Sequence, residues 1–211
     1  MLTRLLLIAN ILVFVWTSIH DATASTSRLV QFGAFYGPAV DNGEWWRAFT
    51  TAFLHENIWH IGFNMFALWQ IGRLVEQLFG SVKMAVVYVA SMIGSAWAIY
   101  HFNYDVVTVG ASGAIFGLFG ALIAAGLKLG KAGMQLVQSM LGVVLINLIF
   151  GFTVPNISQA GHVGGLISGF IVGFLIYFPP VRLRRPMSVD VQAQGTPVEA
   201  ELLPPREQPP P

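Results

Sequence analysis

Six long apolar segments constrain this chain more than any other feature of its sequence. They run over residues 2–19, 58–75, 84–102, 111–127, 135–152 and 162–178. Each is close to the ~20 residues that a helix needs to cross the hydrocarbon core of a bilayer. Because lipid offers no partners to backbone polar groups, segments of this kind are expected to be helical. We therefore predict an all-α membrane protein built as a bundle of six transmembrane helices.

The composition supports a membrane protein. Hydrophobic residues make up 55% of the chain and charged residues 10%, whereas soluble domains carry roughly 25% charged residues. The sequence has no basic patch mixed with aromatic residues and no phosphate-binding loop, so we expect no nucleic-acid partner. The absence of cysteine excludes a thiol nucleophile and a cysteine-ligated metal. We expect no cofactor and no metal.

The first segment allows two interpretations. Residues 2–19 are long enough to span the membrane, and we favour a retained helix. However, Arg4, the short apolar stretch and the sequence ATA at 22–24 also fit a signal peptide with its cleavage site.

The basic residues predict the orientation of the chain. Lys and Arg concentrate on the cytoplasmic side of membrane proteins. Eight of them fall at alternate ends of the segments: Arg4, Arg73, Lys83, Lys128, Lys131, Arg182, Arg184 and Arg185. Both termini are then cytoplasmic, and the loops 20–57, 103–110 and 153–161 face outward. We expect a membrane domain over 1–178 and a disordered cytoplasmic tail over 179–211, with no soluble domain and no internal repeat.

Four polar residues fall at one depth of the predicted bundle. Ser112 opens the fourth segment, His162 opens the sixth, and His60 and Asn64 lie in the outer half of the second. Polar groups inside a membrane are costly and usually mark function. Three segments that are not adjacent in sequence thus bring polar side chains to the same level.

These residue types are the parts of an acyl-transfer site. A serine at a helix start is close to backbone N–H groups that stabilise negative charge. The imidazole of His162 can remove the proton of Ser112. His60 and Asn64, four residues apart, share one helix face and can donate hydrogen bonds to an oxyanion. Since no Asp or Glu lies at that depth, we predict a dyad rather than a triad.

Other interpretations remain open at this point. Ser112, in the sequence GASGAIFG, could be a small residue that only allows two helices to pack closely. The glycines at 165, 169 and 173 recur every four residues and are best explained as a helix-contact face. A small channel or transporter would need internal repeats and charges near the midplane, and the sequence has neither.

Two catalytic motifs known from other hydrolases do not match this sequence. The sequence HENIWH, from His55 to His60, is one residue too long for the H-E-x-x-H zinc motif, and Trp59 stands where the second histidine should be. The serine elbow of soluble hydrolases is also absent, because Ala114 replaces its last glycine and no strand precedes it.

With these residues in hand, the chain resembles the rhomboid intramembrane serine proteases over nearly all of residues 1–178. Five motifs occur in the family's order: EWWRAFT, HENIWHIGFN, GRLVEQLFG, GASGAIFG and AGHVGGLISG. The resemblance implies that Ser112 is the nucleophile and His162 the general base. It implies an oxyanion hole formed by His60, Asn64 and the backbone N–H of Ser112.

The resemblance also implies supporting residues and a substrate class. The supporting positions are Gly110, which shapes the turn before the nucleophile, Gly113, Phe116 beside the histidine, His55, Trp46, Arg47 and Glu76. The substrates would be single-span membrane proteins cleaved in or near the span, and membrane lipids surround the enzyme. The expected location is a bacterial cytoplasmic membrane. The alternative within the family is an inactive relative that only binds membrane proteins.

Overall fold

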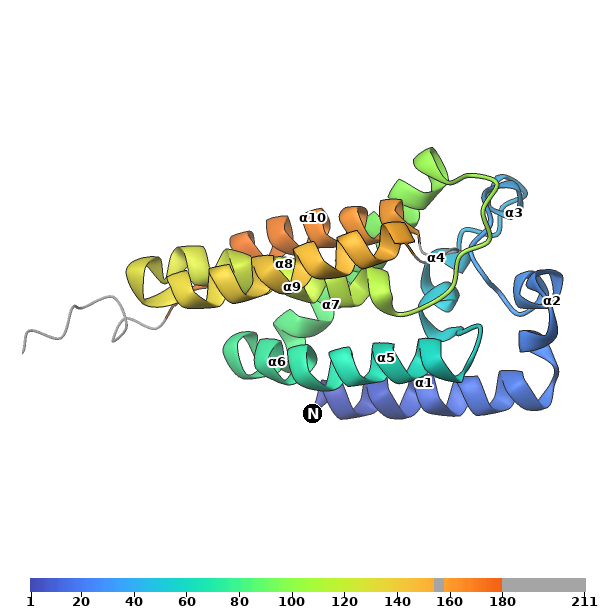
Figure 1. The fold of residues 1–211 in the computed structure, drawn as a ribbon, viewed down its shortest axis with the longest axis horizontal. Coiled ribbons are helices and arrows are strands. Elements are labelled where there is room, and N and C mark those ends of the chain that lie inside the picture. Colours follow the sequence, from blue (N-terminus) through green and yellow to red (C-terminus); the bar gives the residue numbers. More distant parts are fainter. Residues whose placement is uncertain (154–157, 180–211) are drawn as a thin grey trace, which may run out of the picture. The chain divides into compact units, whose positions relative to one another are not determined.

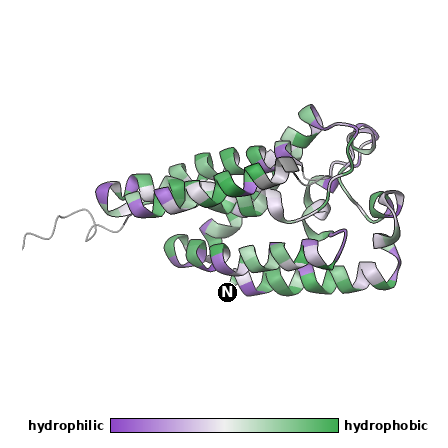
Figure 2. Ribbon diagram, in the orientation of Figure 1, coloured by the Kyte–Doolittle hydropathy of each residue, from purple (hydrophilic) through white to green (hydrophobic). Residues whose placement is uncertain are grey.

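The computed structural model describes residues 1–153 and 158–179, and every regular element in those ranges is helical. The apolar segments form α1 (Leu2–Ile19), α5 (Ile58–Ala67), η3 (Leu68–Gly72), α6 (Arg73–Phe79), α7 (Ser81–Phe102), α8 (Ser112–Lys128), α9 (Met134–Thr153) and α10 (Gln159–Ile176). Short helices lie in the connections: η1 (Ala22–Ala24), α2 (Thr26–Gln31), α3 (Gly37–Asp41), α4 (Arg47–Thr50), η2 (Thr51–Phe53) and η4 (Gly130–Gly133). Apolar residues dominate the long helices (Figure 2).

The all-helical prediction is confirmed for the described residues. Four stretches are long and apolar enough to cross a membrane: Leu2–Ile19, Ser81–Phe102, Gly130–Ile149 and Gln159–Ile176. The shorter helix α8 is also apolar, with 17 residues. The count of six spans and the side of each terminus stay predictions. The predicted tail 179–211 lies outside the described residues except for Pro179.

The second apolar segment is not one uniform α-helix. It continues from α5 through a π-helical turn, η3, into α6. A π-turn bonds residue i to i+5 and is uncommon, and it often occurs near functional sites. Gly72 ends this turn, and a methyl group built there would lie 2.9 Å from the side chain of Thr3. The turn therefore packs closely against α1, which runs beside α5 in Figure 1.

Helix α8 is the centre of the bundle. All its residues from Gly113 to Gly126 are buried, and α7, α9 and α10 pack around it (Figure 1). A helix that is apolar on every side is expected in such a central position. Because α8 is central, the residues at its beginning can be reached from the helices around it.

Glycines bring α8 and α10 into backbone contact. We call Gly113 and Gly117 of α8, with Gly165 and Gly169 of α10, the glycine seam. A methyl group built at Gly165 would overlap the backbone of Gly113, and one at Gly169 would overlap that of Gly117. Close approach of this kind supplies helix association in a membrane, where apolar burial alone cannot. The predicted contact face of the sixth segment is confirmed, and Gly173 also belongs to it, against Ala121.

The first helix is tied to the bundle by Glu76. The carboxylate of Glu76 accepts from the backbone N–H of Leu2 at 2.6 Å and from the hydroxyl of Thr3 at 2.7 Å. An acidic group at a helix start satisfies N–H groups that have no partner within the helix. On α1, Thr3, Asn10 and Thr17 are fully buried. Helix α1 thus has polar side chains buried along its length.

Candidate active site

Ser112 is the first residue of α8, and the turn before it is fixed at two points. Gly110 has a φ of +119°, a conformation that glycine adopts far more easily than other residues. Its N–H donates to the carbonyl oxygen of Thr51 at 2.9 Å. The hydroxyl of Thr51 in turn donates to the carbonyl oxygen of Thr108 at 2.6 Å. The connection 20–57 thus holds the chain that leads to Ser112.

His162 meets Ser112 directly. It lies in the first turn of α10, and its Nε2 is 2.8 Å from the Oγ of Ser112. The serine hydroxyl can donate to Nε2 when the ring proton is on Nδ1. Within the described residues, the buried Nδ1 has no hydrogen-bond partner. In the described part of the chain, Ser112 and His162 therefore form a pair without a third residue bonded to the imidazole.

The ring of His162 is held by an aromatic neighbour. Phe116, one turn into α8, stacks on it with ring centroids 4.1 Å apart and planes 7° from parallel. Flat stacking limits rotation of the imidazole about its side-chain torsions while leaving its edge, with Nε2, directed at Ser112. Gly113 lies in the same turn of α8, and a side chain there would collide with Ser95 of α7.

His60 approaches the same point from α5. A methyl group built at Gly110 would lie 2.7 Å from Nε2 of His60 and 3.8 Å from Oγ of Ser112. The start of α5 is capped by Asn57, whose side chain accepts from the backbone N–H of His60 at 2.9 Å. The cap and the turn at Gly110 thus place an imidazole beside the serine.

Asn64 is buried on the same helix but is occupied within it. Its side-chain amide donates to the carbonyl oxygen of His60 at 2.9 Å. In the described structure no hydrogen bond joins Asn64 to Ser112 or His162. The amide group has a second N–H that this hydrogen bond does not use.

Backbone donors complete the site. The first N–H of α8 that bonds back along the helix is that of Ile115, to the carbonyl of Ala111 at 3.0 Å. The N–H of Ser112 precedes it and belongs to the donors that every helix start leaves without a partner in the helix. It therefore lies next to the serine oxygen and can donate a hydrogen bond to a negatively charged oxygen there.

His55 lies in the connection 20–57 and packs against His60. Its side chain is fully buried, and its ring meets that of His60 edge to face with centroids 5.1 Å apart. Burial, reinforced by the neighbouring His60, lowers the pKa of His55 to about 3. His55 is therefore neutral at physiological pH and acts as a packing partner of His60.

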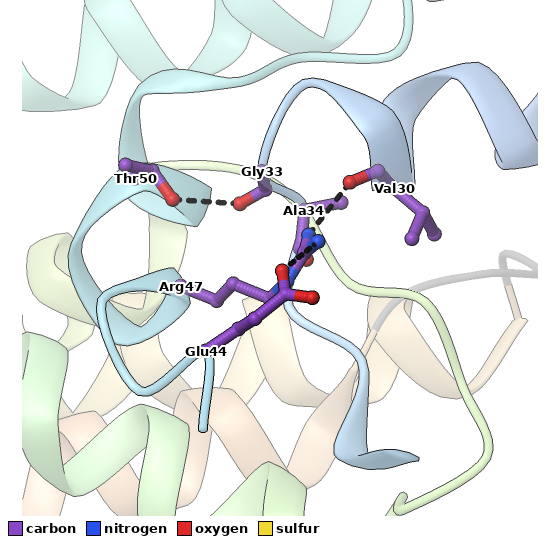
Figure 3. Close-up of polar contacts among 6 residues, drawn as sticks. All are labelled: Val30, Gly33, Ala34, Glu44, Arg47 and Thr50. Atoms are coloured by element: carbon purple, nitrogen blue, oxygen red, sulfur yellow. Dashed lines mark hydrogen bonds and ion pairs between the residues drawn. The ribbon is translucent and has the colours of Figure 1, made fainter. Parts of the chain in front are cut away.

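Arg47 organises the connection itself, as Figure 3 shows. Its side chain is only 5% exposed. The guanidinium donates to the carbonyl oxygens of Val30 at 2.6 Å and Ala34 at 2.8 Å and forms an ion pair with Glu44. Its other face covers the ring of Trp46 at 4.8 Å. Arg47 and Trp46 thus shape the loop that holds the turn before Ser112, whereas Glu76 lies at the far end of the bundle against α1.

Two contacts near the site did not follow from the sequence. The hydroxyl of Ser158 donates to the side-chain oxygen of Asn103 at 3.2 Å, and Thr51 fixes the turn at Gly110. Ser158 stands just before an apolar segment, which is a typical helix-cap pattern. Its partner, 55 residues away, could be found only from the fold.

Comparison with known proteins agrees with the order of motifs along the chain. The family model described as the Rhomboid domain matches residues 42–178, a range that contains Ser112, His162, His60 and Asn64. The chain belongs to the rhomboid family. With its apolar helices it is a membrane protein of that family.

Several named proteins are similar to this rhomboid chain. Rhomboid protease GluP of Bacillus subtilis is 38% identical over 178 residues, which cover 84% of this chain and 35% of the relative. RHOMBOID-like protein 6, mitochondrial, of Arabidopsis thaliana is 34% identical over 160 residues, 74% of this chain and 52% of the relative. Putative rhomboid protease YdcA of Bacillus subtilis is 33% identical over 142 residues, 66% of this chain and 71% of the relative. The chain thus spans about a third to a half of the length of the first two.

Proposed function

We propose that this rhomboid protein is an intramembrane serine endopeptidase. The observation that carries the proposal is the 2.8 Å contact between Ser112 Oγ and His162 Nε2, in a chain whose relatives include proteins named rhomboid protease. A serine next to an imidazole is the usual arrangement of an activated nucleophile. The membrane domain of the proposal spans residues 1–178 with six helices, and both termini are cytoplasmic.

The proposed reaction uses the site residues in two steps. The oxygen of Ser112 attacks a peptide carbonyl carbon while its proton passes to Nε2 of His162. The resulting oxyanion accepts hydrogen bonds from the N–H of Ser112, from His60 and from Asn64. When the C–N bond breaks, Nε2 returns the proton to the leaving amine. Water then attacks the acyl carbon while Nε2 of His162 takes its proton. The C–O bond to Ser112 breaks, the carboxylic acid leaves, and the proton returns to the oxygen of Ser112.

The proposed substrates are transmembrane segments of single-span proteins. A helix pairs its own backbone groups, so the scissile bond must leave the helix before Ser112 can reach it. Gly or Pro near that bond would lower the cost of unwinding. The proposed location is a bacterial cytoplasmic membrane, with the site towards the outer surface where water is available.

The test is covalent labelling of the detergent-purified protein with a fluorophosphonate probe, together with cleavage of a single-span test substrate. We expect wild type to label and cleave, and Ser112→Ala and His162→Ala to do neither while remaining folded. Ser139→Ala is the matched control, because Ser139 is exposed on α9. Labelling of Ser112→Ala at the wild-type rate would contradict the proposal. A folded wild type that neither labels nor cleaves would favour an inactive, helix-binding relative.

A further inference from the structure

The first turn of α10, which carries His162, is built on Ser158. The hydroxyl of Ser158 accepts from the backbone N–H of Gly161 at 3.1 Å, and its carbonyl oxygen accepts from the backbone N–H of His162 at 3.1 Å. A serine cap of this kind fixes the start of a helix. The position of His162 therefore depends on where Ser158 is held.

Asn103 holds Ser158 from the end of α7. The Ser158 hydroxyl donates to Oδ1 of Asn103 at 3.2 Å. Asn103 is itself fixed, because its N–H donates to the carbonyl of Ile99 at 2.7 Å and its carbonyl accepts from the N–H of Val106 at 3.0 Å. The backbone of Asn103 is thus fixed at the end of α7.

The glycine seam cannot supply this restraint. It sets how closely α10 approaches α8, but glycine surfaces have no side chains that would oppose rotation or sliding of one helix along the other. A small displacement of a catalytic group can cost a large factor in rate. Among the described residues, and apart from the His162–Ser112 contact itself, one other side-chain bond joins this turn to another helix, from Gln159 to the carbonyl of Leu148 on α9, and at 3.3 Å it is longer.

We propose that Asn103 is a positioning residue: through its hydrogen bond to Ser158 it orients the first turn of α10, so that His162 meets Ser112. The inference rests on the proposed function, since it assigns Asn103 to the reaction of that site. Asn103 does not touch the reacting atoms and acts only through the helix cap.

The test measures the rate constant of fluorophosphonate labelling at Ser112, in the full chain, as a function of pH. We expect Asn103→Ala and Ser158→Ala each to slow labelling by about tenfold, the order of effect of losing a helix cap or one hydrogen bond. The double variant should be no slower than Ser158→Ala, because Ser158→Ala already removes the contact with Asn103 together with the cap bond to Gly161. Ser158→Thr, which keeps the hydroxyl, should restore most of the rate. In cleavage assays kcat should fall while KM stays constant.

Tyr104→Phe is the matched control. It removes one hydrogen bond from the same turn, but that bond is directed to Asp41 and not to α10. We expect this variant to label at the wild-type rate. Any of three results would overturn the inference. Asn103→Ala and Ser158→Ala could label at the wild-type rate, their losses of labelling rate could add up in the double variant, or Tyr104→Phe could lose as much labelling rate as they do. If Ser158→Ala does not fold, Asn103→Ala compared with Tyr104→Phe decides. Failure of the proposed function is separate, because wild type itself would then not label.

Discussion

The glycine seam and the connection 20–57 both hold Ser112 in place, but by opposite means. The seam works by shape, since the backbone of α10 touches that of α8 at glycines that leave no room for a side chain. The connection works by hydrogen bonds, from Arg47 and Thr51 to backbone carbonyl oxygens. The difference teaches that the seam should respond to added volume, whereas the connection should respond to lost donors and to pH.

The largest effect is expected from adding volume to the seam. Gly169→Ala places a methyl group on the backbone of Gly117, which cannot move aside as a flexible side chain would. We expect a loss of about 3 kcal/mol in the free energy of unfolding, at the upper end of the range for overpacking. Equilibrium unfolding in mixed micelles measures this loss.

Gly142→Ala on α9 is the matched control for the seam. A methyl group built at Gly142 has no heavy atom within 4 Å. Since Ala has a higher helix propensity than Gly by about 1 kcal/mol, this variant should be as stable as wild type or slightly more stable. Equal losses of unfolding free energy in Gly169→Ala and Gly142→Ala would show that backbone contact at the seam does not determine stability.

A smaller effect is expected from removing donors in the connection. Arg47→Ala leaves the carbonyl oxygens of Val30 and Ala34 without their donor and Glu44 without its ion pair. We expect the free energy of unfolding to fall by about 2 kcal/mol, the cost of unpaired polar groups at a buried position. Arg28→Ala, which removes an arginine whose hydrogen bonds are exposed, should change stability by less than about 0.5 kcal/mol. If the two variants lose the same amount, the connection does not depend on the buried arginine.

The smallest effect is a pH dependence that only the connection should show. The pKa of His55 is about 3 in the folded protein against 6.5 ordinarily. Below pH 6.5 the unfolded chain therefore binds a proton that the folded protein does not, and stability falls as pH decreases. From pH 7 to pH 6 the loss from this group is at most about 0.7 kcal/mol.

His55→Gln isolates this contribution, because glutamine does not titrate. The difference in unfolding free energy between wild type and the variant should shrink on going from pH 7 to pH 6. Taking this difference removes the contribution of Glu56, whose burial raises the pKa of its carboxyl group. A difference that does not change with pH would mean that His55 titrates alike in both states.

Much of this architecture could be predicted from the sequence, for identifiable reasons. Apolar length predicted the helices, and the observed boundaries differ from the predicted ones by a few residues at most, as for α10, which begins at Gln159 rather than His162. The four-residue spacing of Gly165 and Gly169 predicted a contact face, since that spacing places residues on one side of a helix. The shared depth of Ser112 and His162 indicated that they would meet.

Contacts between distant positions could not be predicted in the same way. Nothing in the local pattern pairs Asn103 with Ser158 or Thr51 with Gly110, because each contact depends on how separate helices are placed. The use of Asn64 by its own helix was also not foreseen, since an amide can donate in several directions. The π-helical turn at Leu68–Gly72 contains no proline to indicate it.

Because of that turn, the second segment works only with its present number of residues. His60 near its beginning faces the serine, and Glu76 near its end faces the first residues of α1, so both ends have a required direction. Successive residues of an α-helix are about 100° apart around the axis. Deleting a single residue between them would therefore turn Glu76 away from Thr3 or His60 away from Ser112, even if every remaining side chain were unchanged. The segment carries information in its number of residues as well as in their identity.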